Sequence, residues 1–141
     1  MLRPEVRRGI TRTVLLIGPW AVKVPSLRSH GDGLSGVLWS VTRGIQANLS
    51  EQAWSGSPGV CPVVWSAAGL VNVYLRCQPV THEPTEQEYE ATGALGPVDR
   101  KPQNVGWLHG RLVWVDYDMS WNDCRICSNG RTVRAPLPGC V

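Results

Sequence analysis

Apolar and polar residues alternate in several short stretches of the chain, and two of these stretches predict β-hairpins in its first half. The segment TVLLIGPWAVKVP, residues 13–25, is apolar on both sides of Gly18-Pro19, a dipeptide that favours a turn. Residues 59–79 predict a second hairpin, with its turn near residues 67–69. Its second arm alternates as a half-buried strand does and extends to Cys77.

A third hairpin is predicted near the end of the patterned part of the chain. Residues 104–107 form one arm and residues 111–116 form the other, with His109-Gly110 in the turn between them. Residues 119–141 show no clear period and are expected to be irregular.

One long helix is predicted over residues 34–54, where apolar residues recur with a helical period. Glu51 lies on the flank of this apolar stripe, above Gly44 and Ala47. Small residues at these two positions would let another element come close to the helix. The apolar stripe consists of Leu34, Val37, Leu38, Val41, Ile45 and Leu49.

A second, short helix is predicted within the acidic residues 81–95, where Thr85 and Glu88 have the spacing of a capping box. The expected order is therefore strands, helix, strands, short helix and hairpin. This order is typical of an α+β fold built on an antiparallel sheet. At 141 residues, the chain is long enough for one domain with one core.

The basic residues are unusual, because the chain has twelve arginines and two lysines. A GC-rich genome favours Arg codons, so the two lysines are the residues that call for a reason. Residues 1–50 carry seven basic and two acidic side chains, which could favour an anionic ligand or form a solvated surface. A net charge of +3 is too small to indicate nucleic-acid binding.

Membrane insertion and secretion are not predicted. No apolar run approaches the length of about eighteen residues that a transmembrane helix needs. The first ten residues, MLRPEVRRGI, lack the apolar centre of a signal peptide. Five cysteines are an odd number, which argues against a secreted disulfide framework. We therefore expect a cytoplasmic protein.

Zinc is not expected either. Cys124, Cys127 and Cys140 suggest a site, but a structural zinc ion takes four ligands, and the fourth would be a distant residue such as His109. We expect these cysteines to be unligated thiols.

Several motifs fit the requirements of phosphoryl transfer from ATP, which needs a cation at the phosphates, oxygen ligands for Mg²⁺ and a carboxylate near the attacking hydroxyl. The segment D-R-K-P-Q-N, residues 99–104, resembles the D-x-K-P-x-N catalytic loop of protein kinases. V-D-Y-D, residues 115–118, resembles their metal-binding D-F-G segment. W-A-V-K-V-P, residues 20–25, resembles their V-A-I-K strand, and Glu51 stands on the following helix. Both lysines of the chain fall on lysine positions of this pattern.

The resemblance to protein kinases implies a nucleotide site. Lys23 would contact the α- and β-phosphates of ATP, and Glu51 would pair with Lys23. Arg76, Cys77 and Gln78 would lie in the hinge that meets the adenine. The sequence also looks like small kinase-like proteins of phages and of bacteria with GC-rich genomes, and a phage-encoded protein would act in the host cytoplasm.

The resemblance also implies catalytic and metal-binding roles. Asp99 would orient or deprotonate an acceptor hydroxyl, and Lys101 would neutralise charge on the transferred group. Asn104 and Asp116 would hold Mg²⁺. Taken separately, each motif is also compatible with a purely structural role: Lys23 with Glu51 as an ion pair, residues 99–104 as a polar turn, and Asp116 in a solvated loop.

The chain departs from the kinase pattern in ways that bear on activity. RRGITRTV, residues 7–14, contains one glycine where kinases have a glycine-rich loop, and Pro97-Val98 replaces the usual His-Arg. About twenty residues separate the hinge from Asp99, and no A-P-E segment follows Asp116. The implied fold is one kinase-like domain with a strongly truncated C-lobe. It divides into a small lobe over residues 1–79, a short helix and catalytic hairpin over 80–118, and a tail over 119–141.

Two functions are consistent with these features. The chain would be either a miniature ATP-dependent phosphotransferase acting on a small molecule or a partner protein, or an inactive pseudokinase that serves as a protein-binding or regulatory module. The lysines and carboxylates favour the enzyme, whereas the missing glycine loop and C-lobe favour the binding module.

Overall fold

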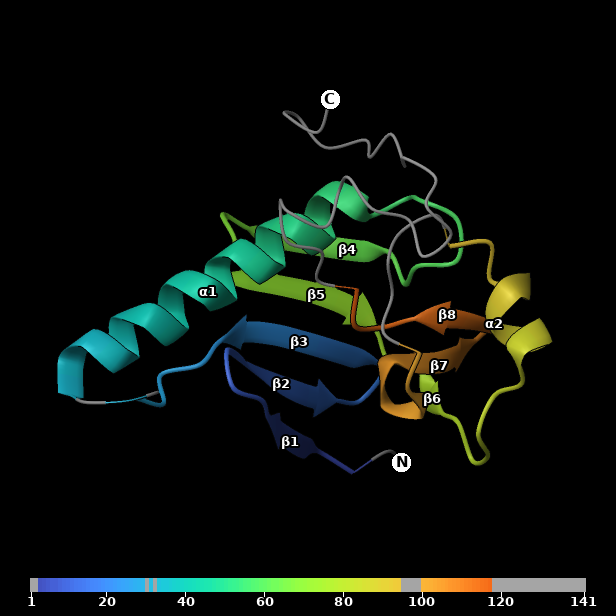
Figure 1. The fold of residues 1–141 in the computed structure, drawn as a ribbon, viewed down its shortest axis with the longest axis horizontal. Helices are drawn as coiled ribbons and strands as arrows, with labels where there is room; N and C mark the ends of the chain where they lie inside the picture. Colours follow the sequence, from blue (N-terminus) through green and yellow to red (C-terminus); the bar gives the residue numbers. More distant parts are fainter. Residues whose placement is uncertain (1–2, 30, 32, 95–99, 118–141) are drawn as a thin grey trace. The chain divides into compact units, whose positions relative to one another are not determined.

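The structure is a computed structural model, and it describes residues 3–29, 31, 33–94 and 100–117. The chain folds into two compact units, and each unit is built from two separate segments of the sequence. The first unit takes the residues up to Gln52 and then Val63–Arg76. The second unit takes Ala53–Pro62 and the described residues from Cys77 onward. The elements of both units are labelled in Figure 1.

The first unit consists of a five-stranded antiparallel sheet and one long helix, α1, which covers Gly33–Trp54 and whose last two residues belong to the second unit. The strand order is β1-β2-β3-β5-β4. This arrangement confirms the predicted α+β class with an antiparallel sheet and one main helix. The strands are β1 (Glu5–Arg8), β2 (Arg12–Ile17), β3 (Trp20–Pro25), β4 (Val63–Ala67) and β5 (Val71–Leu75).

Both predicted turns of this sheet are confirmed. Strands β2 and β3 pair from Ile17 and Trp20 outward, with Gly18 at φ +53° in the turn. Strands β4 and β5 are joined through Ala68 and Gly69, both with positive φ, which lies close to the predicted position. Strand β1 has no counterpart among the predicted elements.

Helix α1 packs on the sheet through its small and polar residues. The apolar stripe that predicts the helix is not its fully buried face: Leu34, Leu38 and Leu49 are 74%, 58% and 45% exposed, and Val37, Val41 and Ile45 are half-buried. Gly44 explains this choice: a Cβ there would lie 2.5 Å from the Thr11 carbonyl oxygen. A larger residue would hold the helix away from the sheet. The buried helix residues of the first unit are Gly36, Ser40, Gly44, Ala47, Asn48 and Glu51.

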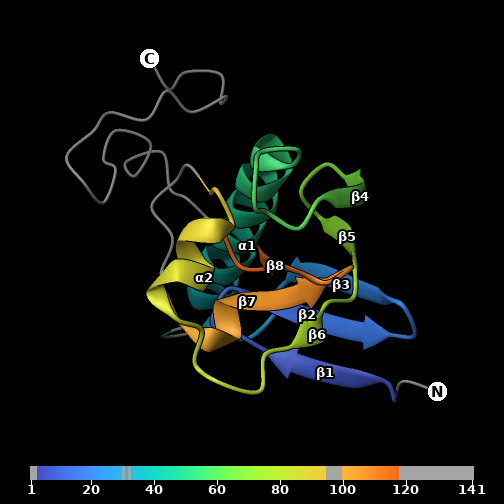
Figure 2. The same cartoon turned by 90° about the vertical axis from the view of Figure 1, so that its right-hand side faces the viewer.

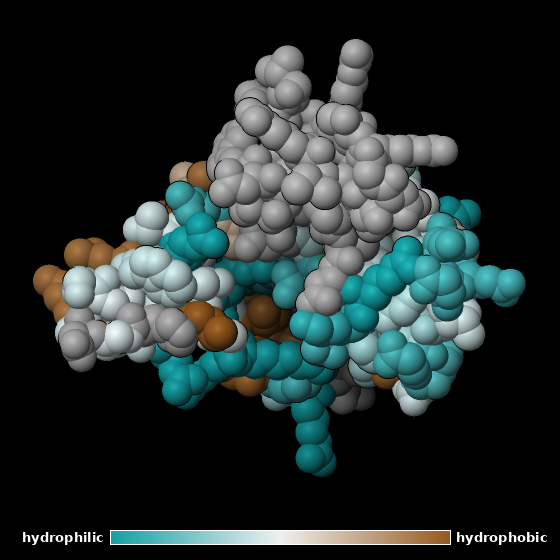
Figure 3. Space-filling model, viewed as in Figure 1, coloured by the Kyte–Doolittle hydropathy of each residue, from teal (hydrophilic) through white to brown (hydrophobic). Residues whose placement is uncertain are grey.

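Because helix α1 turns its small and polar residues toward the sheet, part of its apolar stripe is exposed on the surface. In Figure 3, apolar side chains are visible on the part of the surface where α1 begins. Leu34 and Leu38 lie on the first turns of this helix and are among the exposed large apolar residues of the first unit. On the same unit, Val64 and Trp65 of β4 are 52% and 58% exposed.

The second unit contains a three-stranded antiparallel sheet of order β6-β7-β8 and the short helix α2 (Figure 2). The capping box of α2 is confirmed, since Thr85 accepts from the Glu88 backbone and Glu88 accepts from the Thr85 backbone. The predicted hairpin is also confirmed, with His109 and Gly110 in its turn at φ +50° and +75°. The elements are β6 (Gln78–Pro79), α2 (Glu86–Ala91), the 3₁₀ turn η1 (Pro102–Asn104), β7 (Val105–Leu108) and β8 (Arg111–Trp114).

The core of the second unit forms around Trp114, which is 1% exposed. Its ring stacks on Tyr89 of α2 at 5.5 Å between centroids, and its Nε1 donates to the Thr92 hydroxyl at 3.1 Å. The prediction that the second hairpin extends to Cys77 is wrong. Strand β5 ends at Leu75, and the next residues pair with β7 instead, with Gln78 opposite Trp107.

Neither α1 nor α2, the two α-helices within the described residues, is both long and apolar enough to cross a bilayer.

Candidate functional site

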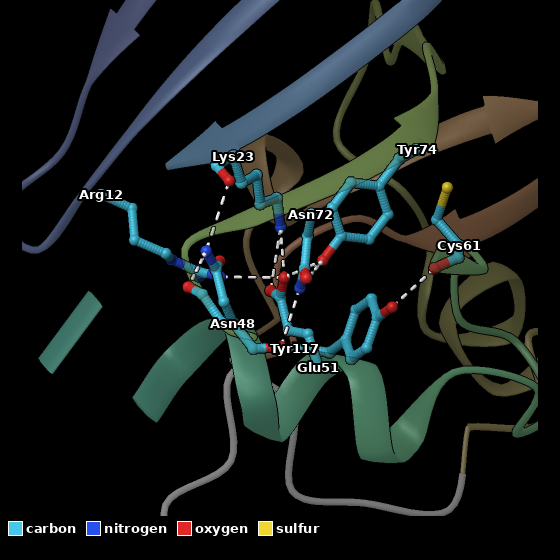
Figure 4. Close-up of polar contacts among 9 residues, drawn as sticks. Arg12, Lys23, Asn48, Glu51, Cys61, Asn72, Tyr74 and Tyr117 are labelled. Atoms are coloured by element: carbon cyan, nitrogen blue, oxygen red, sulfur yellow. Dashed lines mark hydrogen bonds and ion pairs between the residues drawn. The ribbon is translucent and has the colours of Figure 1, made fainter. Parts of the chain in front are cut away.

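The first unit brings Lys23 and Glu51 together. Lys23 lies on β3 and Glu51 on the buried face of α1, and the lysine Nζ donates to both carboxylate oxygens at 2.9 and 3.0 Å. The two side chains point toward each other between helix and sheet (Figure 4). Glu51 is fully buried and Lys23 is 6% exposed. Close packing at Gly44 is what lets a carboxylate on this helix reach a lysine on the sheet.

Two further residues contact Glu51 and are not predicted from the sequence. Arg12 of β2 places its Nη1 2.9 Å from Glu51 Oε2, and the Tyr74 hydroxyl donates a short hydrogen bond to the same oxygen. A signal for Arg12 is present in the hairpin register: Val14 faces Lys23, and Arg12 is two residues away on the same face of β2. The general excess of arginine in the chain hides this signal.

Two fully buried asparagines join the strand of Lys23 to the helix of Glu51. Asn48 of α1 donates through Nδ2 to the Lys23 carbonyl at 3.3 Å and to the Gly69 carbonyl at 2.9 Å. Asn72 of β5 stands opposite Lys23 in the sheet and donates to the Asn48 carbonyl at 2.8 Å. These bonds fix β3, β5 and α1 against one another (Figure 4).

The ionised side chains around Glu51 are mainly positive. Burial raises the pKa of Glu51, but Lys23, Arg12 and the Tyr74 hydrogen bond outweigh burial and lower that pKa to about 2. Glu51 is therefore a carboxylate at neutral pH. The charges of Lys23, Arg12 and Glu51 sum to +1, which favours an anionic ligand near these three groups.

The second unit brings Asn104 and Asp116 together. Asn104 ends the η1 turn before β7, and Asp116 follows β8. The Asn104 carbonyl accepts from the backbone N–H of Val115 at 2.8 Å and of Asp116 at 3.3 Å. Asp116 is exposed and Asn104 is half-buried. Carboxylate and amide oxygens are ligands that Mg²⁺ prefers, so the chemistry of this pair fits the ion.

The other catalytic-loop residues lie near this pair or outside the described residues. Lys101 is exposed, and its carbonyl accepts from the Asn104 backbone N–H at 2.9 Å, which closes the η1 turn. Asp99 lies outside the described residues.

The predicted hinge residues fall on both sides of the boundary between the units. Arg76 belongs to the first unit, where its backbone N–H donates to the Pro19 carbonyl at 2.7 Å. Its Nη1 also donates to the Arg3 carbonyl at 3.1 Å. Cys77 and Gln78 belong to the second unit, where Gln78 begins β6.

A metal site built from several His, Cys, Asp or Glu side chains is absent from the part of the chain that the structure describes. Cys124, Cys127 and Cys140 lie outside that part.

Comparison with models of protein families, with curated proteins and with solved structures finds no match to this chain.

Proposed function

We propose that this chain is a miniature kinase-like protein that binds Mg²⁺-ATP. Lys23 serves the phosphates, held by Glu51, and Asn104 with Asp116 serves the metal ion. Arg76, Cys77 and Gln78 serve the adenine. These roles rest on the resemblance of the sequence to protein kinases, and the local geometry of each unit is compatible with them.

The observation that carries the proposal is the buried contact between Lys23 and Glu51, one of the two lysines of the chain held by a carboxylate on the main helix. Buried ion pairs are weak contributors to stability, because desolvation offsets much of their attraction. Stability alone is therefore a poor reason for this pair. Arg12 adds a second cation beside it, and positive charge is what the phosphates of a nucleotide need.

Phosphoryl transfer is the activity that the remaining residues would support. Asp99 would orient or deprotonate the acceptor hydroxyl, and Lys101 would neutralise charge that develops on the transferred group. Asp116 and Asn104 would offer hard oxygen ligands to Mg²⁺. The acceptor would be a small molecule or a side chain of a partner protein.

The alternative is an inactive pseudokinase that binds a partner protein. One observation favours it. Strands β1 and β2 are joined by a tight connection in which the Gly9 N–H donates to the Arg12 carbonyl at 2.8 Å. Kinases cover the phosphates with a glycine-rich loop at this place, and such a short connection has little backbone to offer.

Calorimetric titration of the full chain with Mg²⁺-ATP tests the proposal, with Lys23→Arg and Lys101→Arg as a matched pair. The guanidinium is wider and planar, so Lys23→Arg should weaken binding tenfold or more, about 1.4 kcal/mol. Lys101→Arg should bind ATP like the parent, since Lys101 would act on the transferred group.

Melting temperatures of both variants show whether a loss of binding reflects a loss of folding. ADP release with the parent would indicate the enzyme, and binding without release the pseudokinase. Absence of Mg²⁺-ATP binding by intact parent protein would refute both functions as nucleotide-binding proteins, and equal affinities for all three proteins would remove Lys23 from the site.

A further inference from the structure

Two cysteines of the second unit stand close enough to react with each other. The Cys77 thiol donates a hydrogen bond to the Cys61 sulfur, with 3.7 Å between the two Sγ atoms. Cys61 is 1% exposed and Cys77 is partly exposed. A disulfide has its sulfurs about 2.0 Å apart, so the two Sγ atoms would have to approach by about 1.7 Å to form one.

The backbone holds both cysteines in place. Cys61 donates its N–H to the Trp114 carbonyl at 2.8 Å, and its carbonyl accepts from the Tyr117 hydroxyl at 2.6 Å, a bond drawn in Figure 4. Cys77 directly precedes β6, which pairs with β7. A Cβ at Gly106 would lie 2.7 Å from the Cys77 Cβ, so glycine leaves the space that this side chain occupies.

The two residues also mark where the chain leaves and re-enters the second unit. The chain passes to the first unit between Pro62 and Val63, and it returns between Arg76 and Cys77. The residues in between form the β4–β5 hairpin of the first unit. A covalent bond between Cys61 and Cys77 would therefore close a loop that contains this hairpin.

We propose that Cys61 and Cys77 form a reversible disulfide when the protein meets a low-molecular-weight disulfide such as oxidised glutathione. The more accessible Cys77 thiolate attacks one sulfur of the oxidant, which breaks the S–S bond of the oxidant and releases one thiolate. Cys61, as thiolate, then attacks Cys77 Sγ, forms the protein disulfide and releases the second glutathione thiolate. Two protein thiols lose two electrons and two protons, and one small disulfide becomes two thiols.

The bond would join the two ends of the loop that carries β4 and β5. Closing a loop restricts the unfolded chain, so the oxidised protein should unfold at a higher temperature than the reduced one. In a reducing compartment such a bond is transient and responds to the thiol–disulfide balance. This chemistry uses only the second unit and does not depend on nucleotide binding.

The test treats reduced full-length protein with oxidised glutathione and maps the linked peptides by mass spectrometry without reduction. The expected result is one peptide pair that joins Cys61 to Cys77, together with a melting temperature several degrees higher. Both changes should reverse with dithiothreitol. Cys77→Ser should abolish both, and its side chain is exposed enough to tolerate serine.

A second variant, with Cys124, Cys127 and Cys140 all changed to serine, serves as the matched control and should keep both the link and the thermal shift. A stable mixed disulfide of Cys77 with glutathione, or links that join Cys61 or Cys77 to the other cysteines, would overturn the proposal. Failure of both thiols to react while Cys124 or Cys127 does react would overturn it as well.

Discussion

Glu51 is the residue on which the polar interior of the first unit depends. It accepts from Lys23 and Tyr74 and lies 2.9 Å from Arg12, and its own side chain is fully buried. Each of these partners comes from a different strand of the sheet. Loss of this one charge would therefore remove the carboxylate that holds two nearly buried cations together.

We expect Glu51→Gln to lower the free energy of unfolding by about 3–5 kcal/mol, the usual cost of removing one partner from a buried ion pair. Chemical unfolding at neutral pH measures it. Glu90→Gln is a suitable control, since Glu90 is an exposed acidic residue of α2, and it should change stability by less than about 0.5 kcal/mol.

The pH dependence of this difference follows from the low pKa of Glu51. That pKa is about 2 in the folded protein and near 4.5 in the unfolded chain, so its charge stabilises the fold fully above pH 4.5. The contribution, about 3 kcal/mol, is lost as pH falls from 4.5 toward 2. The gap between parent and Glu51→Gln should therefore shrink over this window. A gap that stays constant down to pH 3 would show that the carboxylate charge is not the cause.

The sequence points to Lys23 and Glu51 through its motifs, whereas Arg12 is hidden among the many arginines and nothing singles out Tyr74. The motifs pair the two residues although they lie 28 positions apart. Arg12 and Tyr74 belong to no such motif. Their role depends on the register of three strands, and only the folded sheet brings them to one oxygen.

Among the elements, α1 shows best why a helix can be predicted while its buried face is not. Its apolar period is genuine, and the helix forms where that period predicts it. Hydrophobicity favours burying the apolar stripe, but Gly36, Ser40, Gly44 and Ala47 allow a closer approach to the sheet. That approach brings Asn48 and Glu51 to their partners, and the hydrogen bonds they make decide the orientation.

Gly44→Ala tests this account, because two effects on the helix oppose each other. Alanine is the better helix former by about 1 kcal/mol. The added Cβ, however, would lie 2.5 Å from the Thr11 oxygen and 2.7 Å from Pro25 Cα, which are backbone atoms that cannot easily move. We expect net destabilisation of about 1–3 kcal/mol in chemical unfolding.

Thr42→Ala on the exposed side of the same helix is the matched control. Only propensity acts there, so this change should leave stability equal or raise it by a few tenths of a kcal/mol. Stabilisation by both substitutions would mean that the helix does not pack closely at Gly44.

The strands differ in how well the local sequence predicts them. Hairpins with glycine in a tight turn are predicted well, because the turn residues fix which strands pair, as at His109-Gly110. Strand β1 escapes prediction because all four of its residues are exposed and show no apolar alternation. Strand β6 has two residues and is defined only by its long-range pairing with β7, which no local pattern reveals.

For the molecule as a whole, the order of the elements is enough to predict the α+β class. It does not predict that each unit is assembled from two segments that alternate along the sequence. Residues 53–62 lie between the two segments of the first unit in the sequence, but they pack in the second unit. Contacts such as the bonds of Cys61 with Trp114 and Tyr117 join positions more than fifty residues apart. The number of independent domains therefore stays a prediction.

The first unit is expected to fold without the second. Its sheet, almost all of α1 and the Glu51 cluster lie within residues 3–52 and 63–76. We expect a fragment of residues 1–76, with residues 53–62 replaced by a Gly/Ser linker of equal length, to fold with helical circular dichroism and to melt cooperatively. The same fragment carrying Glu51→Gln should lose its cooperative melting transition, because the fragment is expected to be less stable than the full chain. A parent fragment that melts without cooperativity would show that the first unit folds only with the second.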